Sequence, residues 1–349
     1  MKNLWPKKLP VWVNEYQPII YRREALQLEE IYSLVKDDLQ GVEQQFKQLV
    51  ESQQDRFPEL YEMLKQVLIG GKIIRPTLTL LSGRFYEYST EKLLPMATAS
   101  ELLHIATLVH DDAIDKADMR RSRETINKLW GLERAVILGD FLFAMAGRFA
   151  TDTGNLRAVN LFTRTLENIS RGELRQGFSA FSLEQTYEDY IERIAGKTAA
   201  LFAMATESGA VLSQAPEESV QGLKRYGYNL GITFQIVDDI LDFVSTEKEM
   251  GKPVASDLAQ GTVTLPSLLL MQKYPQDNPV KRLFKNEGDK QQNIEKAVEM
   301  VRNRGFIDES YRIANEYKTE ACRSLELLPD SSARQSLLAL ADYIIGRRK

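Results

Sequence analysis

The sequence feature that most restricts the fold is a pair of aspartate clusters, each directly following an apolar run with helical spacing. The first cluster is Asp-Asp-x-x-Asp at 111–115, after the apolar residues of 102–109. The second has the same spacing at 238–242, inside the run FQIVDDILDF. In a helix, the first and last aspartates of such a cluster lie one turn apart on one face, with the middle aspartate beside them. The sequence therefore predicts two helices that each carry a wall of three carboxylates.

Three neighbouring carboxylates are expected to hold a cation, because like charges at this spacing destabilise a helix and burial raises the cost. Oxygen ligands alone suit a hard divalent ion, and Mg²⁺ needs few protein ligands when a substrate phosphate supplies the others. A solvated acidic helix end would explain either cluster alone, but not both. We therefore predict two walls facing one cavity. The predicted metal ligands are Asp111, Asp112, Asp115, Asp238, Asp239 and Asp242.

Helical periodicity extends over most of the chain, and no alternating strand pattern or linker interrupts it. Residues 135–150 are apolar almost all round and are expected to form a central buried helix. Further long helices are predicted over 155–178, 183–211 and 217–244, and Pro95 is expected to open the helix of the first cluster. The predicted fold is all-α, a single large helical bundle around a central cavity. It comprises residues 23–349 after an N-terminal tail of residues 1–22.

Composition excludes several classes of function. The 45 basic and 49 acidic residues give a formal net charge of −4, so nucleic acid is not an expected partner. The single cysteine, Cys322, excludes an internal disulfide framework and fits a reducing compartment, so we expect a cytoplasmic protein. The sequence shows no membrane span or secretion signal. Trp5 and Trp12 in the tail allow at most peripheral membrane contact.

A pocket for a diphosphate also needs fixed cations that take up phosphate charge not neutralised by metal. The candidates for these cations are basic residues at the ends of predicted helices. Any one of them could simply be a solvated surface charge, but this does not explain why the whole set accompanies two acidic clusters. His104 lies two turns before Asp111, and Gln235 lies three residues before Asp238, so both face the same way as those aspartates. The basic candidates are Lys72, Arg75, Arg120, Arg121, Lys197 and Lys252.

Five motifs occur in an order and at separations that resemble the trans-isoprenyl diphosphate synthase, or polyprenyl synthetase, family. The match covers nearly the whole chain after about residue 25 and is most like a long-chain, heptaprenyl-type catalytic component. The motifs are GGKIIRP (70–76), HDDAID (110–115) with MRRSRET (119–125), GKT (196–198), FQIVDDILD (234–242) and GKPVASDLAQGTVTLP (251–266).

The resemblance implies a Mg²⁺-dependent prenyltransferase of the isoprenoid synthase fold. Such an enzyme condenses isopentenyl diphosphate with an allylic diphosphate (farnesyl or geranyl) by successive 1′-4 additions. Two or three Mg²⁺ ions would arrive with the allylic diphosphate. Asp111, Asp115 and Asp238 would ligate them directly, and Asp112, Asp239 and Asp242 directly or through water. Lys72, Arg75, His104 and Arg121 would hold isopentenyl diphosphate. Arg120, Lys197, Thr198, Gln235 and Lys252 would serve the allylic diphosphate, with Lys197 also counted as catalytic. A homodimer is expected, and a heterodimer with a small regulatory subunit is also compatible.

The chain departs from the family pattern at three positions. Thr262 stands where the family often has a lysine, which removes one phosphate contact. Ser122 and Ala255 each replace a glycine that is usual in the family. These departures affect the expected loop geometry and the affinity for the allylic substrate, but not the reaction class.

Product length is expected to depend on the helix before the first cluster. In the family, a bulky aromatic residue four or five positions before the first aspartate stops chain growth early. Here those positions are Thr107 and Ala106, both small, with Leu103 one turn further back. We therefore predict an all-trans product of roughly hexaprenyl to octaprenyl length. The alternative is a short-chain (farnesyl or geranylgeranyl) synthase whose floor is set by Phe141 or Phe143.

Three other functions are compatible with parts of the pattern. A class I terpene cyclase would leave GGKIIRP and the Arg120–Arg121 pair without a second substrate to hold. A non-catalytic partner subunit of a two-component synthase would not need all six aspartates. A helical metal-binding scaffold would leave the basic residues unexplained.

Overall fold

The computed structural model describes residues 28–68, 73–120, 123–246 and 253–347. Helices account for nearly all of the regular structure, and the described residues contain one two-stranded ribbon, in which β1 (Met119–Arg120) pairs antiparallel with β2 (Arg123–Glu124). The helices are η1 (Ser33–Val35), α2 (Lys36–Glu51), α3 (Pro58–Val67), α4 (Ile74–Gly83), α5 (Thr90–Ile114), α6 (Ile126–Trp130), α7 (Leu132–Asp152), α8 (Leu156–Ser179), α9 (Tyr187–Ile194), η2 (Ala195–Ala199), α10 (Ala200–Leu212), α11 (Glu217–Val244), α13 (Ser256–Ala259), α14 (Leu265–Lys273), α15 (Pro279–Phe284), α16 (Lys290–Asn303), α17 (Phe306–Ser324), η3 (Leu325–Leu327) and α18 (Ser332–Gly346).

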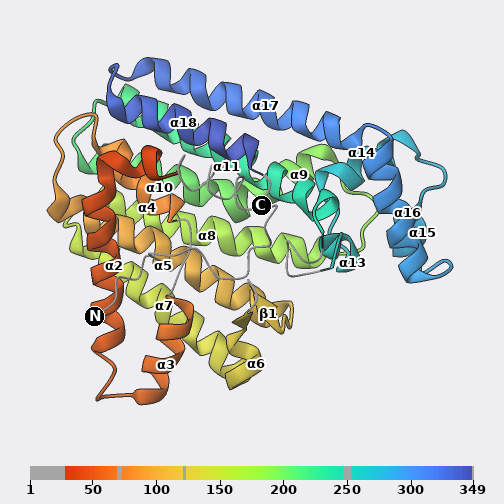
Figure 1. The fold of residues 1–349 in the computed structure, drawn as a ribbon, viewed down its shortest axis with the longest axis horizontal. Helices are drawn as coiled ribbons and strands as arrows, with labels where there is room; N and C mark the ends of the chain where they lie inside the picture. The colour runs from red at the N-terminus through yellow and green to blue at the C-terminus, as the bar shows by residue number, and fades with distance from the viewer. Residues whose placement is uncertain (1–27, 69–72, 121–122, 247–252, 348–349) are drawn as a thin grey trace, which may run out of the picture.

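Helix α10 lies at the centre of the bundle and packs against α4, α5, α8 and α11. Helix α7 covers the other side of α5, and α17 covers the other side of α11, so layers of helices succeed one another across the molecule (Figure 1). Helices α2 and α3 lie at one end, and α13 to α16 lie at the other (Figure 1). The predicted all-α bundle is therefore confirmed.

Two buried apolar clusters form the core, and α11 contributes to both. Leu223, Tyr226 and Leu230 belong to the larger cluster, together with residues of α4, α5, α7 and α10. Ile236 and Ile240, further along α11, belong to the smaller cluster with residues of α14 to α17. One helix of 28 residues therefore joins the two halves of the core. Among the described residues, no helix combines the length and the apolar character that crossing a bilayer requires.

The predicted helix over 217–244 is confirmed at both ends. The stretch 183–211, predicted as one helix, is helical from Tyr187 to Leu212 but is not regular throughout. That stretch consists of α9, a single π-helical turn at η2, and α10. A π turn inserts a residue into the helical path and is frequent at functional sites. Here close packing accompanies it, because a Cβ added at Gly172 of α8 would lie 3.0 Å from the amide nitrogen of Lys197.

Two other expectations need correction. The helix over 135–150 is not buried all round, because only one face of α7 is buried and Val136 and Ile137 on the other face are exposed. The helix of the first cluster begins at Thr90, so Pro95 lies inside it rather than opening it. Leu93, in this first turn, packs directly on Gly83, and burial of apolar area there favours helix despite the proline.

Candidate functional site

The two acidic helices line one cavity of about 820 Å³, as predicted. Helices α5 and α11 form opposite walls, and residues from α4, α8, α9, η2 and the segment 253–264 complete the lining. Five of the six predicted aspartates line the cavity: Asp111, Asp112, Asp115, Asp238 and Asp239. The sixth, Asp242, is buried beside it.

The first cluster makes ion pairs with two of the predicted basic residues. The ammonium of Lys197 lies 3.5 Å from Asp111 Oδ2 and 2.6 Å from Glu173 Oε1. Arg120 Nε donates to Asp112 Oδ1 at 2.7 Å. Burial raises the pKa of both Asp112 and Asp115, against the opposing effects of Arg120 and Lys197. Burial lowers the pKa of Lys197, but the charges of Asp111 and Glu173 outweigh it, so the net shift is upward and the ammonium stays charged.

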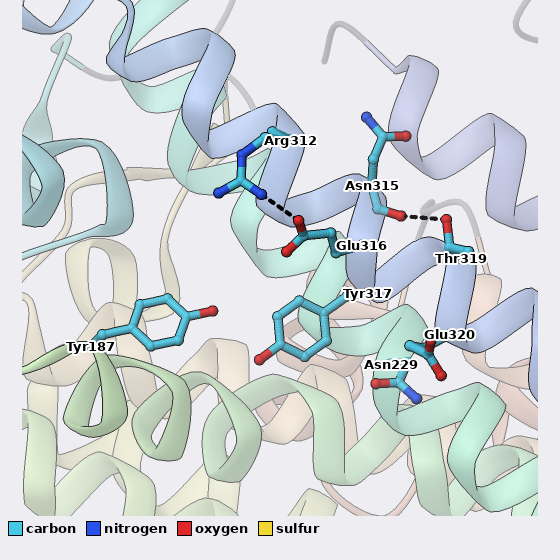
Figure 2. A pocket seen from close by; sticks show the side chains of 8 residues that line it. All are labelled: Tyr187, Asn229, Arg312, Asn315, Glu316, Tyr317, Thr319 and Glu320. Atoms are coloured by element: carbon cyan, nitrogen blue, oxygen red, sulfur yellow. Dashed lines mark hydrogen bonds and ion pairs between the residues drawn. The ribbon is translucent and has the colours of Figure 1, made fainter.

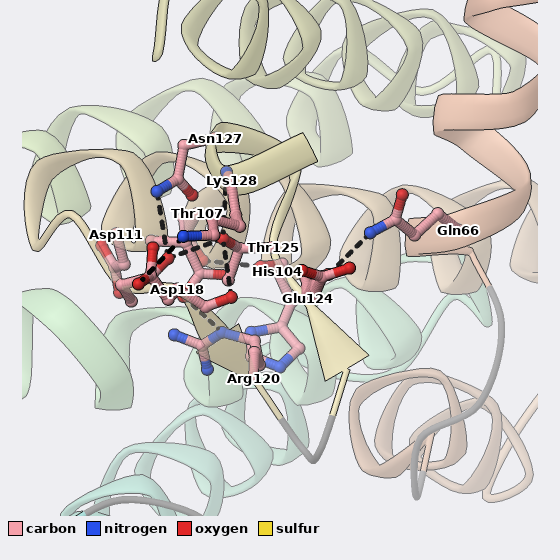
Figure 3. A network of polar contacts seen from close by, with 12 residues as sticks. Gln66, His104, Thr107, Asp111, Asp118, Arg120, Glu124, Thr125, Asn127 and Lys128 are labelled. Atoms are coloured by element: carbon pink, nitrogen blue, oxygen red, sulfur yellow. Dashed lines mark hydrogen bonds and ion pairs between the residues drawn. The ribbon is translucent and has the colours of Figure 1, made fainter. Parts of the chain in front are cut away.

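A polar network holds Arg120 in this position. Thr125 Oγ1 and Asn127 Nδ2 both donate to the carbonyl of Ala117, which ties the turn between α5 and the ribbon to the start of α6. Gln66 Nε2 donates to the Glu124 carbonyl, which ties β2 to α3 (Figure 3). The ribbon therefore directs the Arg120 side chain back toward the C-terminal end of α5 (Figure 3).

The second cluster contains a buried carboxylate with several partners. Tyr190 OH donates to Asp239 Oδ2 at 2.7 Å, and Gln235 Nε2 donates to Asp239 Oδ1 at 2.9 Å. Thr198 Oγ1 in turn donates to Gln235 Oε1 at 2.6 Å, which links the π turn to α11. Burial, with the nearby charge of Asp257, raises the pKa of Asp239 to about 7. Thr198 and Gln235, both predicted for the allylic diphosphate, are thus brought together.

Asp238 and Asp242 have different environments, although a helical repeat places them on one face. The side chain of Asp238 is 41% exposed and pairs with Arg347 at 2.6 Å. Asp242 accepts from Ser256 Oγ at 3.1 Å and from the Asp257 amide at 3.4 Å. The segment that carries α13 folds back on the end of α11, so Asp242 anchors a segment that lines the cavity.

The structure also brings together residues on the α4 and α5 wall. Arg75 and His104 line the cavity there, and the Arg75 guanidinium lies 5.0 Å from the centroid of the Phe202 ring. Lys72, Arg121 and Lys252, with the departure at Ser122 and the tail 1–22, lie outside the described residues.

Several charged residues in or near the cavity were not predicted. Glu173 and Arg193 line the cavity from α8 and α9, and neither belongs to a recognisable motif. Asp257 lines the cavity from α13. It belongs to the motif at 251–266, in which Lys252, Ala255 and Thr262 were named but Asp257 was not. Arg347 is buried at the end of the described chain, where its guanidinium carbon lies 3.8 Å from the Phe234 ring centroid and its Nη2 donates to the Phe234 carbonyl. Only the basic run at 347–349 was a sequence signal for it.

Of the three residues predicted to control chain length, Thr107 lines the cavity. Ala106 and Leu103 are fully buried in the core and do not line it in this structure. Apolar side chains that do line it include Leu108, Ile169, Leu201 and Phe234. His110 faces α7 instead, where its Nε2 lies 3.0 Å from the Val136 carbonyl oxygen and its ring packs edge-on against Phe143.

The charge of the cavity tests whether Mg²⁺ fits it. The described lining carries four basic side chains (Arg75, Arg120, Arg193, Lys197) against eight carboxylates (Asp111, Asp112, Asp115, Asp118, Glu173, Asp238, Asp239, Asp257). An anionic ligand is therefore repelled unless cations accompany it. Within the described ranges, no three acidic, histidine or cysteine side chains converge closely enough to hold a metal ion by themselves. The carboxylate oxygens of the lining are the hard donors that Mg²⁺ prefers, and such an ion can take its other ligands from a phosphate.

A second pocket, of about 520 Å³, lies on the outside between α9, α11 and α17 and is shown in Figure 2. Its charged residues are paired with one another or with neighbours, as Arg312 is with Glu309 and Glu316. It contains none of the aspartates of either cluster. It therefore lacks the features that the first cavity combines.

Comparisons of the sequence and of the fold with known proteins agree with one another. The family model described as polyprenyl synthetase matches residues 57–301. Heptaprenyl diphosphate synthase component 2 of Geobacillus stearothermophilus is 39% identical over 325 residues, covering 93% of this chain and 99% of the relative. The crystal structure of a heptaprenyl diphosphate synthase from Staphylococcus aureus superposes with a TM-score of 0.85 at 36% identity, covering 90% of this chain and 99% of the other. A polyprenyl synthase from Caulobacter crescentus CB15, complexed with calcium and isoprenyl diphosphate, superposes with a TM-score of 0.85 at 30% identity, covering 92% and 98%.

Proposed function

Because this chain belongs to the polyprenyl synthetase family, we propose that it is a long-chain trans-polyprenyl diphosphate synthase. It joins isopentenyl diphosphate to an allylic diphosphate, farnesyl or geranyl, by repeated 1′-4 additions. The observation that carries the proposal is that two aspartate walls, on α5 and α11, line a single cavity together with Lys197, Arg120 and Arg75. A terpene cyclase would not need the cations on the α4 and α5 wall.

The metal-binding role is assigned to the aspartates that line the cavity. Asp111, Asp115 and Asp238 would be the direct ligands, and the more buried Asp112 and Asp239 would act directly or through water. Asp242, buried beside the cavity, would act in the same way as Asp112 and Asp239. When bound, two or three Mg²⁺ ions stabilise negative charge on the leaving diphosphate. The calcium and isoprenyl diphosphate bound to the Caulobacter crescentus relative support a divalent ion in this role.

The chain's own residues account for the remaining charge. Lys197, Thr198 and Gln235, with Arg120 and Lys252, hold the allylic diphosphate as its C–O bond breaks and the electron pair passes to the diphosphate. Arg75, His104, Lys72 and Arg121 hold isopentenyl diphosphate so that its double bond attacks the allylic carbon. The proton then lost from the product passes to the departed diphosphate. No protein nucleophile takes part, which agrees with the single cysteine at 322.

Product length follows from the helix that precedes the first cluster. Thr107 lines the cavity, and the small side chain of Ala106 leaves no bulky barrier at this level of α5. The names of the heptaprenyl and solanesyl synthases among the relatives support a long product. A tunnel through this region requires Leu103 and its apolar neighbours to move, because they are closely packed here.

We also propose a dimer formed through the outer faces of α7 and α8. Ile137 on α7 is 59% exposed, and Leu174 and Phe178 on α8 are 63% and 90% exposed, which is unusual for apolar side chains of this size. The partner is a second copy or, as the name "component 2" of the relative suggests, a small regulatory subunit. We further propose that residues 23–349 form a single domain; the contribution of α11 to both apolar clusters of the described residues supports this. The single cysteine supports a cytoplasmic location.

The decisive assay supplies radiolabelled isopentenyl diphosphate, farnesyl diphosphate and Mg²⁺, and reads product length by chromatography. We expect a ladder ending near the heptaprenyl length, and no product when EDTA replaces Mg²⁺. Asp238→Asn should lower the rate by about 100-fold or more. Asp152→Asn, an exposed aspartate on α7, is the control and should leave it unchanged. Failure of the wild-type chain to incorporate label, alone and mixed with a regulatory subunit, would refute the proposal.

A further inference from the structure

Arg193 is a buried cation on the wall of the cavity that the function proposed above does not use. It is the seventh residue of α9, it is 5% exposed, and it lines the cavity. Its Nη1 donates to Gln185 Oε1 at 2.8 Å, and its Nη2 donates to the Val263 carbonyl at 2.5 Å. Its guanidinium carbon lies 5.5 Å from the centroid of the Tyr190 ring.

All these partners are neutral, which distinguishes Arg193 from the other cations nearby. Arg120 and Lys197 are each paired with a carboxylate, whereas no ion pair within the described part of the chain includes Arg193. Burial raises the pKa of the nearby Asp239 and the charge of Arg193 lowers it, but no carboxylate lies within ion-pair distance of Arg193 in the described residues. Its two hydrogen bonds leave three of its five N–H groups for another acceptor. The arrangement is therefore suited to receive an anion.

The position of Arg193 indicates which anion that is. It lies one turn before Lys197 and Thr198, on the segment that also carries Ile194 into the cavity. The carbonyl that it holds belongs to Val263, and the two flanking residues, Thr262 and Thr264, both line the cavity. This is the wall of the second acidic cluster, away from Arg75 and His104 on α4 and α5.

We propose that Arg193 binds the diphosphate of the allylic substrate directly, as a residue additional to Lys197, Thr198 and Gln235. This inference rests on the proposed function for the identity of the ligand. The guanidinium fork suits phosphate oxygens, and its fixed bonds to Gln185 and Val263 orient it before the substrate arrives.

The test is steady-state kinetics on Arg193→Gln in the full-length protein. Loss of a charge-assisted hydrogen bond should raise KM for the allylic diphosphate by about 10- to 100-fold, with KM for isopentenyl diphosphate changed less than about threefold. Thr262→Lys added to this variant places a cation on the same wall and should recover most of the loss. The control is Arg304→Gln, because Arg304 also lies 5.5 Å from a tyrosine ring and bonds a neutral oxygen, but far from the cavity.

A purely structural role for Arg193 predicts a different pattern. It would lower the melting temperature and affect both KM values together, and Thr262→Lys would not rescue it. If Arg193→Gln does not fold, Arg193→Lys replaces it, and we expect an intermediate rise in KM for the allylic substrate only. Unchanged KM for the allylic substrate in a folded Arg193→Gln or Arg193→Lys variant overturns the inference.

Calorimetry separates this inference from the proposed function. Inorganic pyrophosphate with Mg²⁺ should bind the wild-type protein at least about tenfold more tightly than Arg193→Gln. An inactive wild-type protein that nevertheless shows this difference would refute the synthase proposal and retain the anion site. An active wild-type protein without the difference would refute only the role of Arg193.

Discussion

Asp239→Asn should stabilise the metal-free protein, and the gain should increase with pH. The carboxyl is 3% exposed, and burial raises its pKa from 3.8 to about 7. Between these two values the folded state binds more protons than the unfolded state, so folding stability falls as pH rises. Each pH unit in this window costs about 1.4 kcal/mol, so the wild type loses about 2–3 kcal/mol between pH 5 and pH 8. The asparagine variant does not lose this contribution.

The measurement is urea unfolding in EDTA at both pH values, with thermal unfolding as a second readout. The difference in unfolding free energy between variant and wild type should grow by about 2–3 kcal/mol from pH 5 to pH 8, or about 3 °C in Tm for a chain of this length. Asp152→Asn, at an exposed position, should show no such growth. If the difference in unfolding free energy between Asp239→Asn and the wild type were the same at both pH values, ionisation of the buried carboxyl would not destabilise the fold, and the reasoning would be refuted. Enzymatic activity should be lost at either pH.

Three further variants test the site and its packing. Lys197→Met should lower kcat/KM for the allylic diphosphate by about 100-fold or more, because Glu173 and the first cluster lose their shared cation; kinetics at saturating isopentenyl diphosphate measures this. Ala106→Phe should shorten the product, and overpacking should cost about 1–3 kcal/mol of stability; unchanged product length would argue against a tunnel past this residue. Gly231→Ala should cost a similar amount and raise KM for the allylic substrate, because the new Cβ would lie 2.6 Å from the Ala199 Cα; thermal unfolding and kinetics check it.

Local patterns predicted the helices and most of the charged walls, because these features depend on spacing along one helix. The helix over 217–244 and the placement of Asp111 and Asp238 on facing walls follow from apolar periodicity and the Asp-Asp-x-x-Asp repeat. The same reasoning did not indicate the contacts of Asp242. Helical spacing places it beside Asp238, but a segment 14 residues later folds back and bonds it from Ser256.

The residues that were missed depend on contacts between distant segments. Glu173 reaches Lys197 only because α8 and the π turn approach closely at Gly172, and nothing in the sequence near 173 indicates this. Arg193 bonds Val263, 70 residues away, and Arg347 meets α11 across more than 100 residues. Such contacts have no periodicity of their own, so a single sequence does not reveal them. The burial of α7 was mispredicted for another reason. An apolar residue pattern does not distinguish a helix buried in the core from one whose outer face is exposed or contacts another subunit.

The separation of the two acidic walls is set by residues that carry no charge. Helix α10 packs against both α5 and α11, and axes of packed helices lie about 8–10 Å apart, so α10 sets the spacing between the two helices that carry the walls. On α11, Gly227 and Gly231 permit the close approach. A Cβ at Gly227 would lie 2.2 Å from Thr206 Oγ1, and one at Gly231 would lie 2.6 Å from the Ala199 Cα. A shift of α11 at these glycines would move Asp238, Asp239 and Gln235 together relative to Lys197. Affinity for a diphosphate held between the walls therefore depends on small side chains one layer beneath it, as much as on the charges that contact it.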